Sequence, residues 1–133
     1  ITTNSEEMGA QRLRLKTKLE NAIENFSYYE TIEKKGAATL VITYGVTSRA
    51  VRQAVEKSDK GSVLILKTLW PVPEKLISKF ASQYDDILVV EMNLGQYFFE
   101  IKRILPGKNV RFFGQMNGVL ITPSQIREEI DNG

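Results

Sequence analysis

The sequence predicts a three-layer α/β/α domain with a mostly parallel sheet. Four short runs of aliphatic and β-branched residues alternate with segments whose apolar residues recur every three or four positions. The runs are too apolar for strands exposed on one face, so helices are expected to cover both faces of the sheet. With 133 residues, of which 42% are hydrophobic, the chain is long enough to bury one core.

The predicted elements follow one another in regular alternation. Strands are expected at residues 39–44, 62–67, 87–91 and 110–113, and helices at 47–58, 72–84, 96–105 and 124–130. Thr47 or Ser48 is expected to cap the first of these helices, and Gly61 to close it. Proline near the entrance of the helix at 72–84 is compatible with a helix start.

A long amphipathic helix is expected before the sheet, from Ser5 to about Lys34. Its apolar residues recur at helical spacing, at Leu15, Leu19, Ile23 and Phe26. We therefore divide the chain into a linker helix at 1–35 and an α/β domain at 36–133. The apolar stripe allows two interpretations, a linker from an upstream domain or a helix that covers one face of the sheet. Because the sequence begins with Ile1, we expect a fragment or a processed chain.

Composition argues against several classes of function. The formal net charge is +2 with no long basic block, so no nucleic-acid partner is expected. The chain has no Cys, and therefore no disulfide and no thiolate ligand for zinc or an iron–sulfur cluster; it also has no His. No apolar run approaches the roughly 20 residues of a membrane span. We predict a cytoplasmic protein, and we assign no catalytic residue and no metal ligand.

The first candidate site is the turn after the strand at 39–44. Ligands of open parallel sheets bind beyond the carboxyl ends of the strands. Gly45, Thr47 and Ser48 precede a helix whose free amides, together with Arg49 and Arg52, would suit a carboxylate or a phosphate. An ordinary βα turn explains the same residues, because neither a G-x-G-x-x-G pattern nor a P-loop is present.

The second candidate site follows the strand at 87–91. It consists of Glu91, Asn93, Gly95 and Gln96. A lone carboxylate is not an acid–base pair, and no second carboxylate or His is near in sequence. In the alternative interpretation, Glu91 accepts hydrogen bonds from amides of its own turn and Asn93 caps the next helix.

Two aromatic segments are candidates for contacts with other domains. Trp70 and Pro71 would suit either a packed helix entrance or an anchor at a subunit interface. Tyr97, Phe98 and Phe99 are consecutive, and three adjacent helical residues do not share one face. At least one of them is therefore expected to meet another domain.

Three segments, at 40–45, 69–73 and 90–96, resemble the α chains of 2-oxoacid:ferredoxin oxidoreductases in sequence, order and spacing. The opening segment at 5–19 is similar to the linker of that family, and the segment at 118–123 to its closing segment. The resemblance covers nearly the whole chain and implies a fold like the transketolase C-terminal domain.

The resemblance also implies a function at the level of a complex. Such enzymes convert a 2-oxoacid and coenzyme A to acyl-CoA and carbon dioxide while they reduce ferredoxin. Thiamine diphosphate, magnesium and iron–sulfur clusters are expected in the complex, with none bound by this chain alone, and the β subunit is the expected partner. The chain would help to shape the assembly, and both candidate sites would lie on its family-matched edge.

Two other functions compete with this one. A stand-alone small-molecule or anion-binding module would use the turn at Gly45. A phosphoacceptor signalling domain would need acidic residues at the strand ends, where Tyr44 and Lys67 stand instead.

Overall fold

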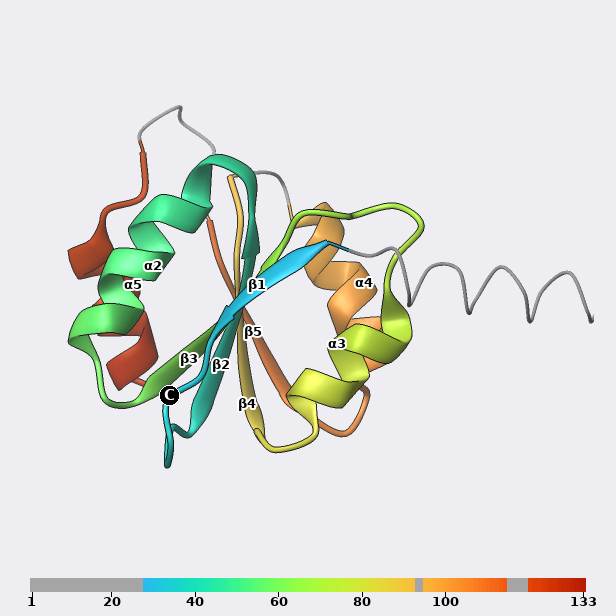
Figure 1. The fold of residues 1–133 in the computed structure, drawn as a ribbon, viewed down its shortest axis with the longest axis horizontal. Coiled ribbons are helices and arrows are strands. Elements are labelled where there is room, and N and C mark those ends of the chain that lie inside the picture. The colour runs from blue at the N-terminus through green and yellow to red at the C-terminus, as the bar shows by residue number, and fades with distance from the viewer. Residues whose placement is uncertain (1–27, 93–94, 115–119) are drawn as a thin grey trace, which may run out of the picture.

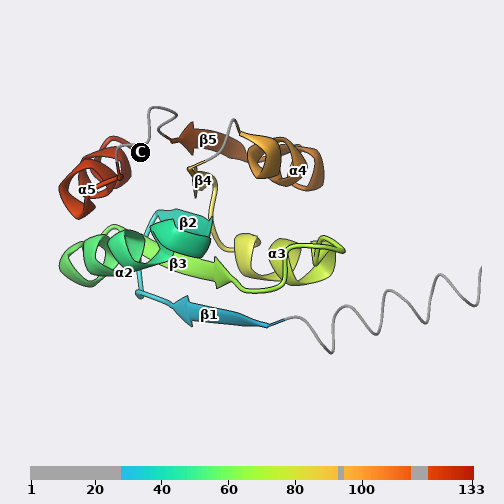
Figure 2. The same cartoon turned by 90° about the horizontal axis from the view of Figure 1, so that it is seen from above.

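The computed structural model describes residues 28–92, 95–114 and 120–133. Five strands form one sheet in the order β1-β3-β2-β4-β5, with helices on both faces (Figures 1 and 2). The strands are β1 Tyr29–Ile32, β2 Thr39–Tyr44, β3 Gly61–Leu66, β4 Asp86–Val90 and β5 Asn109–Phe113. The helices are α2 Ser48–Lys57, α3 Glu74–Ala81, α4 Gln96–Ile104 and α5 Pro123–Asp131, with a 3-10 turn at Gly45–Thr47 before α2.

The prediction of a three-layer domain with a mostly parallel sheet is confirmed. Strands β2, β3, β4 and β5 are parallel, and only β1 runs antiparallel, beside β3. Seen along the sheet in Figure 2, α2 and α5 lie on one side and α3 and α4 on the other. All four predicted strands exist, each within one residue of its expected bounds.

The prediction of a helix that continues to Lys34 is wrong over Tyr29–Ile32. This segment is β1, which pairs with β3 so that Tyr29 lies opposite Leu66. An isolated edge strand would leave backbone amides and carbonyls of β3 unpaired, and β1 satisfies them. Tyr, Thr and Ile also favour strands over helices. The rest of that predicted helix, in residues 1–27, lies outside the described residues.

Three smaller differences have local causes. Helix α3 begins at Glu74 rather than Val72, because Pro73 occupies its N-cap position, and it ends at Ala81. Beyond that end the hydroxyl of Tyr84 donates a hydrogen bond of 2.9 Å to Ser62 within the core. Gly61 begins β3 instead of closing α2. A Cβ atom on Gly61 would lie 3.0 Å from a methyl group of Ile130, so glycine allows α5 to pack closely there.

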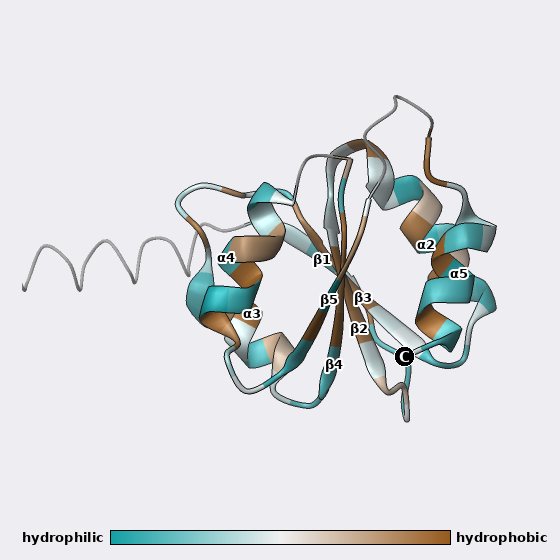
Figure 3. Cartoon of the chain, turned by 180° about the vertical axis from the view of Figure 1, so that it is seen from behind, coloured by the Kyte–Doolittle hydropathy of each residue, from teal (hydrophilic) through white to brown (hydrophobic). Residues whose placement is uncertain are grey.

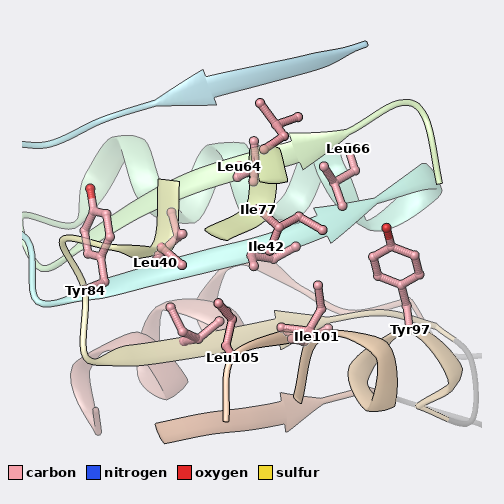
Figure 4. Packing of buried hydrophobic residues seen from close by; sticks show 13 residues of the cluster. Leu40, Ile42, Leu64, Leu66, Ile77, Tyr84, Tyr97, Ile101 and Leu105 are labelled. Carbon is pink, nitrogen blue, oxygen red and sulfur yellow. The ribbon is translucent and has the colours of Figure 1, made fainter. Parts of the chain in front are cut away.

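Two hydrophobic cores lie on the two faces of the sheet. Along β2, Leu40 and Ile42 point toward α3 and α4 (Figure 4), whereas Val41 points toward α2 and α5. Every residue of β3 is buried, as expected for a strand covered on both faces. Figure 3 shows the apolar sides of the helices turned toward the sheet. Within the described residues, no helix has the length and apolar character needed to cross a membrane.

A network of polar side chains closes the amino end of the sheet. The carboxylate of Asp86 accepts hydrogen bonds from Arg111 at 2.8 and 2.9 Å, from the Thr39 hydroxyl at 2.7 Å and from Asn109 at 3.0 Å. Partial burial opposes ionisation of Asp86, but these hydrogen bonds and the charge of Arg111 outweigh it and hold the pKa of Asp86 below its ordinary value. The network joins β2, β4 and β5 at the end of the sheet opposite the candidate sites.

Asp86→Asn is expected to lower the free energy of unfolding by about 2 kcal/mol at pH 7, because Arg111 loses a charged hydrogen-bond acceptor. The pKa of Asp86 is lower in the folded chain than in the unfolded chain. Its stabilisation is therefore complete above the unfolded pKa and is lost as the pH falls through the folded pKa. Urea unfolding at a series of pH values should show the difference from wild type closing below about pH 4.

The neighbouring Asp85 provides the matched control. It is fully exposed, and its pairing distance to Lys108 is 3.8 Å. Asp85→Asn should change the free energy of unfolding by less than about 0.5 kcal/mol. Equal losses in the two variants would show that the Asp86 network does not stabilise the fold.

Candidate functional site

The two candidate sites meet between the carboxyl ends of β2 and β4. These strands are neighbours, and the helix after β2 covers one face of the sheet whereas the helix after β4 covers the other. Such a point, where successive connections turn to opposite faces, is the usual ligand crevice of an open α/β sheet. The topology therefore places the segments after Tyr44 and after Val90 side by side (Figure 1, top).

Two buried threonine hydroxyls join the strand ends. The hydroxyl of Thr43 donates to the backbone carbonyl of Val90 at 2.9 Å. The hydroxyl of Thr47 lies 2.6 Å from that of Thr43 and 2.8 Å from the carbonyl of Tyr44, to which it donates. Thr47 occupies the N-cap position of α2, but its side chain makes no capping hydrogen bond, so the predicted cap is wrong. Its hydroxyl instead holds the Gly45 turn against β4.

The Gly45 turn is stabilised within itself. Gly45 has φ +65°, a left-handed conformation that favours glycine, and the Ser48 hydroxyl donates to the Gly45 carbonyl at 2.7 Å. Arg49 is exposed. Arg52 is paired with Glu30, which also lies 3.3 Å from Lys67. Hydrogen bonds from Lys67 and Arg52 keep the pKa of Glu30 below its ordinary value. One of the two predicted anion contacts is thus already engaged within the chain.

Glu91, the first residue after β4, is completely buried. Neither carboxylate oxygen has a hydrogen-bond partner of normal geometry in the part of the chain that the structure describes. Burial raises the pKa of Glu91, and the nearby backbone amides of Tyr97, Phe98 and Gly95 offset this only in part. The carboxylate of Glu91 therefore faces the backbone amides at the amino end of α4.

The remaining members of the second candidate site begin α4. Gly95, with φ +83°, occupies the N-cap position of α4. That the side chain of Asn93 caps this helix stays a prediction. Asn93 itself lies outside the described residues. Gln96 is exposed at the start of the helix. Glu91 and Gly95 are thus brought together under the first turn of α4, while Gln96 faces away.

An aromatic cluster connects the strand ends to α4. Tyr97 is buried, and its ring lies edge-on to Tyr44 and to Trp70, with centroids 5.4 and 5.8 Å apart. Burial, with smaller effects from neighbouring acidic groups, raises the pKa of Tyr97. Phe98 is half-buried and Phe99 is 65% exposed, so the prediction that the three aromatics do not share one core is confirmed. Whether Phe99 meets another domain stays a prediction.

A shallow groove lies beside this cluster, at the ends of β2 and β3. Its volume is about 340 Å³. It is lined by Tyr44, Gly45, Ser48, Ile65, Leu66, Lys67 and Leu69. The lining combines apolar side chains with one cation, Lys67, and two hydroxyl-bearing side chains, Tyr44 and Ser48. Among the described residues, no group of three or more acidic, His or Cys side chains is placed to hold a metal ion.

Sequence reasoning missed the contribution of Thr43. It reads as one β-branched residue in an apolar run, where a hydroxyl carries no distinct signal. The spacing of Thr43 and Thr47 is informative only once the turn at Gly45 is known, because the turn folds the second hydroxyl back onto the first.

Comparisons with known proteins identify the domain. Residues 37–126 match the family model described as pyruvate:ferredoxin oxidoreductase core domain II. This match covers more than half of the chain. This chain belongs to the pyruvate:ferredoxin oxidoreductase core domain II family. The resemblance carried by the segments at 40–45, 69–73 and 90–96 is thereby confirmed.

Curated relatives of this core domain II chain include subunits of a 2-oxoglutarate synthase and of a ketoisovalerate oxidoreductase. The chain is 37% identical over 95 residues to the 2-oxoglutarate synthase subunit KorA of Methanothermobacter marburgensis. The aligned region covers 68% of this chain and 25% of the relative. The chain is also 31% identical over 111 residues to the ketoisovalerate oxidoreductase subunit VorB of the same organism. That aligned region covers 80% of this chain and 32% of the relative. The chain spans about a quarter of the length of the 2-oxoglutarate synthase subunits that it matches.

Solved structures agree on the fold. The 2-oxoglutarate:ferredoxin oxidoreductase from Magnetococcus marinus superposes with a TM-score of 0.72 at 20% identity, over 99% of this chain and 24% of that one. A split-gene transketolase superposes with a TM-score of 0.51 at 16% identity, over 76% of this chain and 36% of that one. The core domain II chain therefore has the predicted transketolase C-terminal-like fold.

Glu91→Gln is expected to remove a pH-dependent loss of stability. The pKa of Glu91 is higher in the folded than in the unfolded chain. Its favourable contribution to the free energy of unfolding is therefore complete below the unfolded pKa of about 4.3 and is lost as the pH rises through the folded pKa. Urea unfolding between pH 4 and pH 7 should show this loss in wild type but not in the variant. Exposed Glu56→Gln is the control and should follow wild type. A loss of equal size in Glu91→Gln would contradict burial of a titrating carboxyl.

Gly114→Ala tests the close packing behind the site. A Cβ atom there would lie 2.5 Å from the backbone oxygen of Glu91 and 2.5 Å from the ring of Phe112. Overpacking of this kind should lower the free energy of unfolding by about 1–3 kcal/mol, measured by urea denaturation. Gly107→Ala is the matched control, because nothing lies within 4 Å of its Cβ position. An unchanged midpoint for both variants would refute the close contact.

Proposed function

We propose that this chain is the core domain II of the α subunit of a 2-oxoacid:ferredoxin oxidoreductase. The complete enzyme would convert a 2-oxoacid and coenzyme A to acyl-CoA and carbon dioxide and pass two electrons to ferredoxin. The observation that carries the proposal is the family match over residues 37–126. It is supported by relatives named for a 2-oxoglutarate synthase and a ketoisovalerate oxidoreductase, which act on two 2-oxoacids.

The chain's own part in this enzyme is to shape the assembly. Among the described residues, its crevice holds one buried carboxylate, Glu91, and two hydroxyls that are bonded to backbone carbonyls, Thr43 and Thr47. These groups fix the strand ends and the start of α4. We propose that the edge formed by Gly45–Thr47, Ser48 and the turn from Glu91 to Gln96 faces neighbouring parts of the enzyme.

The cofactors of the reaction would be held elsewhere in the complex. An iron–sulfur cluster needs cysteine ligands, and the chain has none. Within the described residues, no cluster of carboxylates suits a magnesium ion. These donor sets do not fit thiamine diphosphate with magnesium or an iron–sulfur cluster. The β subunit and the other domains of the α subunit would supply these groups and the sites for coenzyme A and ferredoxin.

The alternative of a stand-alone anion-binding module gains no support from the geometry. Arg52 is paired with Glu30, and the Ser48 hydroxyl is bonded to the Gly45 carbonyl. Both groups would have to give up existing partners to bind an anion.

The proposal predicts a specific activity for the protein that contains this chain. We expect affinity purification from its native cells to recover a thiamine diphosphate-binding partner chain. The complex should reduce ferredoxin only when a 2-oxoacid and coenzyme A are both present. Pyruvate, 2-oxoglutarate and 2-oxoisovalerate, assayed separately, identify the substrate. Assays without coenzyme A, or with the 2-hydroxyacid of the same carbon skeleton, are the controls. A solitary chain with no such activity would refute the proposal.

A further inference from the structure

Strand β5 forms one edge of the sheet. It stands last in the order β1-β3-β2-β4-β5, as Figure 2 shows. On its inner side, the amide of Asn109 donates to the carbonyl of Asp85 at 2.9 Å. At its other end, the carbonyl of Phe113 accepts from the amide of Glu91 at 3.2 Å. Asn109, Phe113 and the residue midway between them, Arg111, therefore direct their backbone groups toward β4.

The outer side of β5 carries the amides and carbonyls of Val110 and Phe112. Backbone groups of successive residues in a strand point to opposite edges, so these two residues face away from β4. Among the described residues, no strand lies beyond β5 to pair with them. The free amides and carbonyls of an edge strand are a template for pairing with a further strand.

The side chains of β5 give this edge little protection. Edge strands are usually protected by a charge, a proline or a bulge. β5 has no proline, and its one charged side chain, Arg111, is paired with Asp86 at 2.8 Å and lies 3.7 Å from Glu129. Phe112 is 38% exposed, and its ring packs on Phe98 of α4 with centroids 5.6 Å apart. The edge is thus bordered by an exposed aromatic ring.

The positions of the free groups match a second copy of the same strand. β5 runs from Asn109 to Phe113 and is centred on Arg111. A two-fold axis beside Arg111 sets two copies antiparallel, with Val110 of one copy opposite Phe112 of the other. Each such pair exchanges two hydrogen bonds, so the outward groups of both copies are all satisfied. Each pair also places a β-branched side chain beside an aromatic ring, which is a favourable cross-strand contact.

The charge of Arg111 is compensated within each copy. The two Arg111 residues would lie opposite each other at the axis, and like charges in that position normally oppose pairing. Here the guanidinium donates two hydrogen bonds, of 2.8 and 2.9 Å, to the carboxylate of Asp86. The carboxylate of Glu129 is a second nearby negative charge. The side chain is therefore held against its own domain rather than free to repel its counterpart.

We propose that two copies of this chain associate through β5, antiparallel across a two-fold axis at Arg111, so that their two sheets become one continuous sheet. This edge is separate from the segments after β2 and β4 that the proposed function assigns to neighbouring parts of the enzyme. The pairing uses backbone groups and requires no 2-oxoacid, coenzyme A or ferredoxin. Its test therefore succeeds or fails independently of the proposed function.

Amide hydrogen exchange, followed by NMR on the 133-residue chain at increasing protein concentration, tests the pairing residue by residue. We expect the amides of Val110 and Phe112 to exchange about tenfold more slowly in concentrated than in dilute solution. The amides of Arg111 and Phe113 point toward β4 and are internal controls, with protection at every concentration. Sedimentation equilibrium on the same samples should approach twice the monomer mass of 15.1 kDa.

Phe112→Lys should raise the dissociation constant of the dimer about tenfold or more, because it places a charge on the paired edge. Tyr29→Lys is the matched control. Tyr29 is also an exposed aromatic residue of an edge strand, 42% exposed, and its ring packs on Phe80 with centroids 5.4 Å apart. It lies on β1, at the opposite edge of the sheet, and its substitution should leave the dimer intact. Circular dichroism checks that both variants fold.

Three results would overturn the proposal. The first is the mass of a single chain at concentrations up to about 1 mM. The second is a dimer in which the amides of Val110 and Phe112 exchange as fast as in dilute solution, because such a dimer uses another surface. The third is equal weakening by Phe112→Lys and Tyr29→Lys. The exchange measurement uses the wild-type chain, so it decides the question even if Phe112→Lys fails to fold.

Discussion

The structure depends on the burial of β2 on both of its faces and along both of its edges. This strand pairs with β3 on one side and β4 on the other, and residues 39–43 are fully buried. Helices must therefore cover both sides of the sheet, and successive connections must turn to opposite faces. That arrangement opens the crevice between the ends of β2 and β4, where a polar group has to find its partners within the protein.

The groups in the crevice meet this requirement unequally. The hydroxyls of Thr43 and Thr47 lie 2.6 Å apart, and each lies within hydrogen-bond distance of a backbone carbonyl, that of Val90 or of Tyr44. Within the described residues, neither carboxylate oxygen of Glu91 has a hydrogen-bond partner of normal geometry, and the amides at the start of α4 offset its raised pKa only in part. Buried carboxyls with a raised pKa are frequent at functional sites. The backbone amide of Tyr97 lies beside Glu91, and the ring of Tyr97 packs edge-on against the exposed ring of Trp70.

The two ends of the sheet serve different purposes. At the amino end, Asp86 and Arg111 form a satisfied polar network that joins three strands. At the carboxyl end, exposed apolar side chains surround the crevice and the groove. One end holds the sheet together, and the other presents exposed apolar side chains.

The sequence by itself determined the layers, the strands and the family, because apolar strands, helical stripes and the segment around Glu91 are local patterns. The sequence did not determine β1. This strand forms because it pairs with the edge of β3, where Tyr29 lies opposite Leu66, a residue far away in sequence. Nor did it reveal that Thr47 bonds to Thr43, that Arg52 is engaged by Glu30, or that Glu91 is completely buried. Those facts depend on which chain segments meet at the strand ends. Only the tertiary structure fixes that, because hydrogen bonding and desolvation depend on neighbours in space.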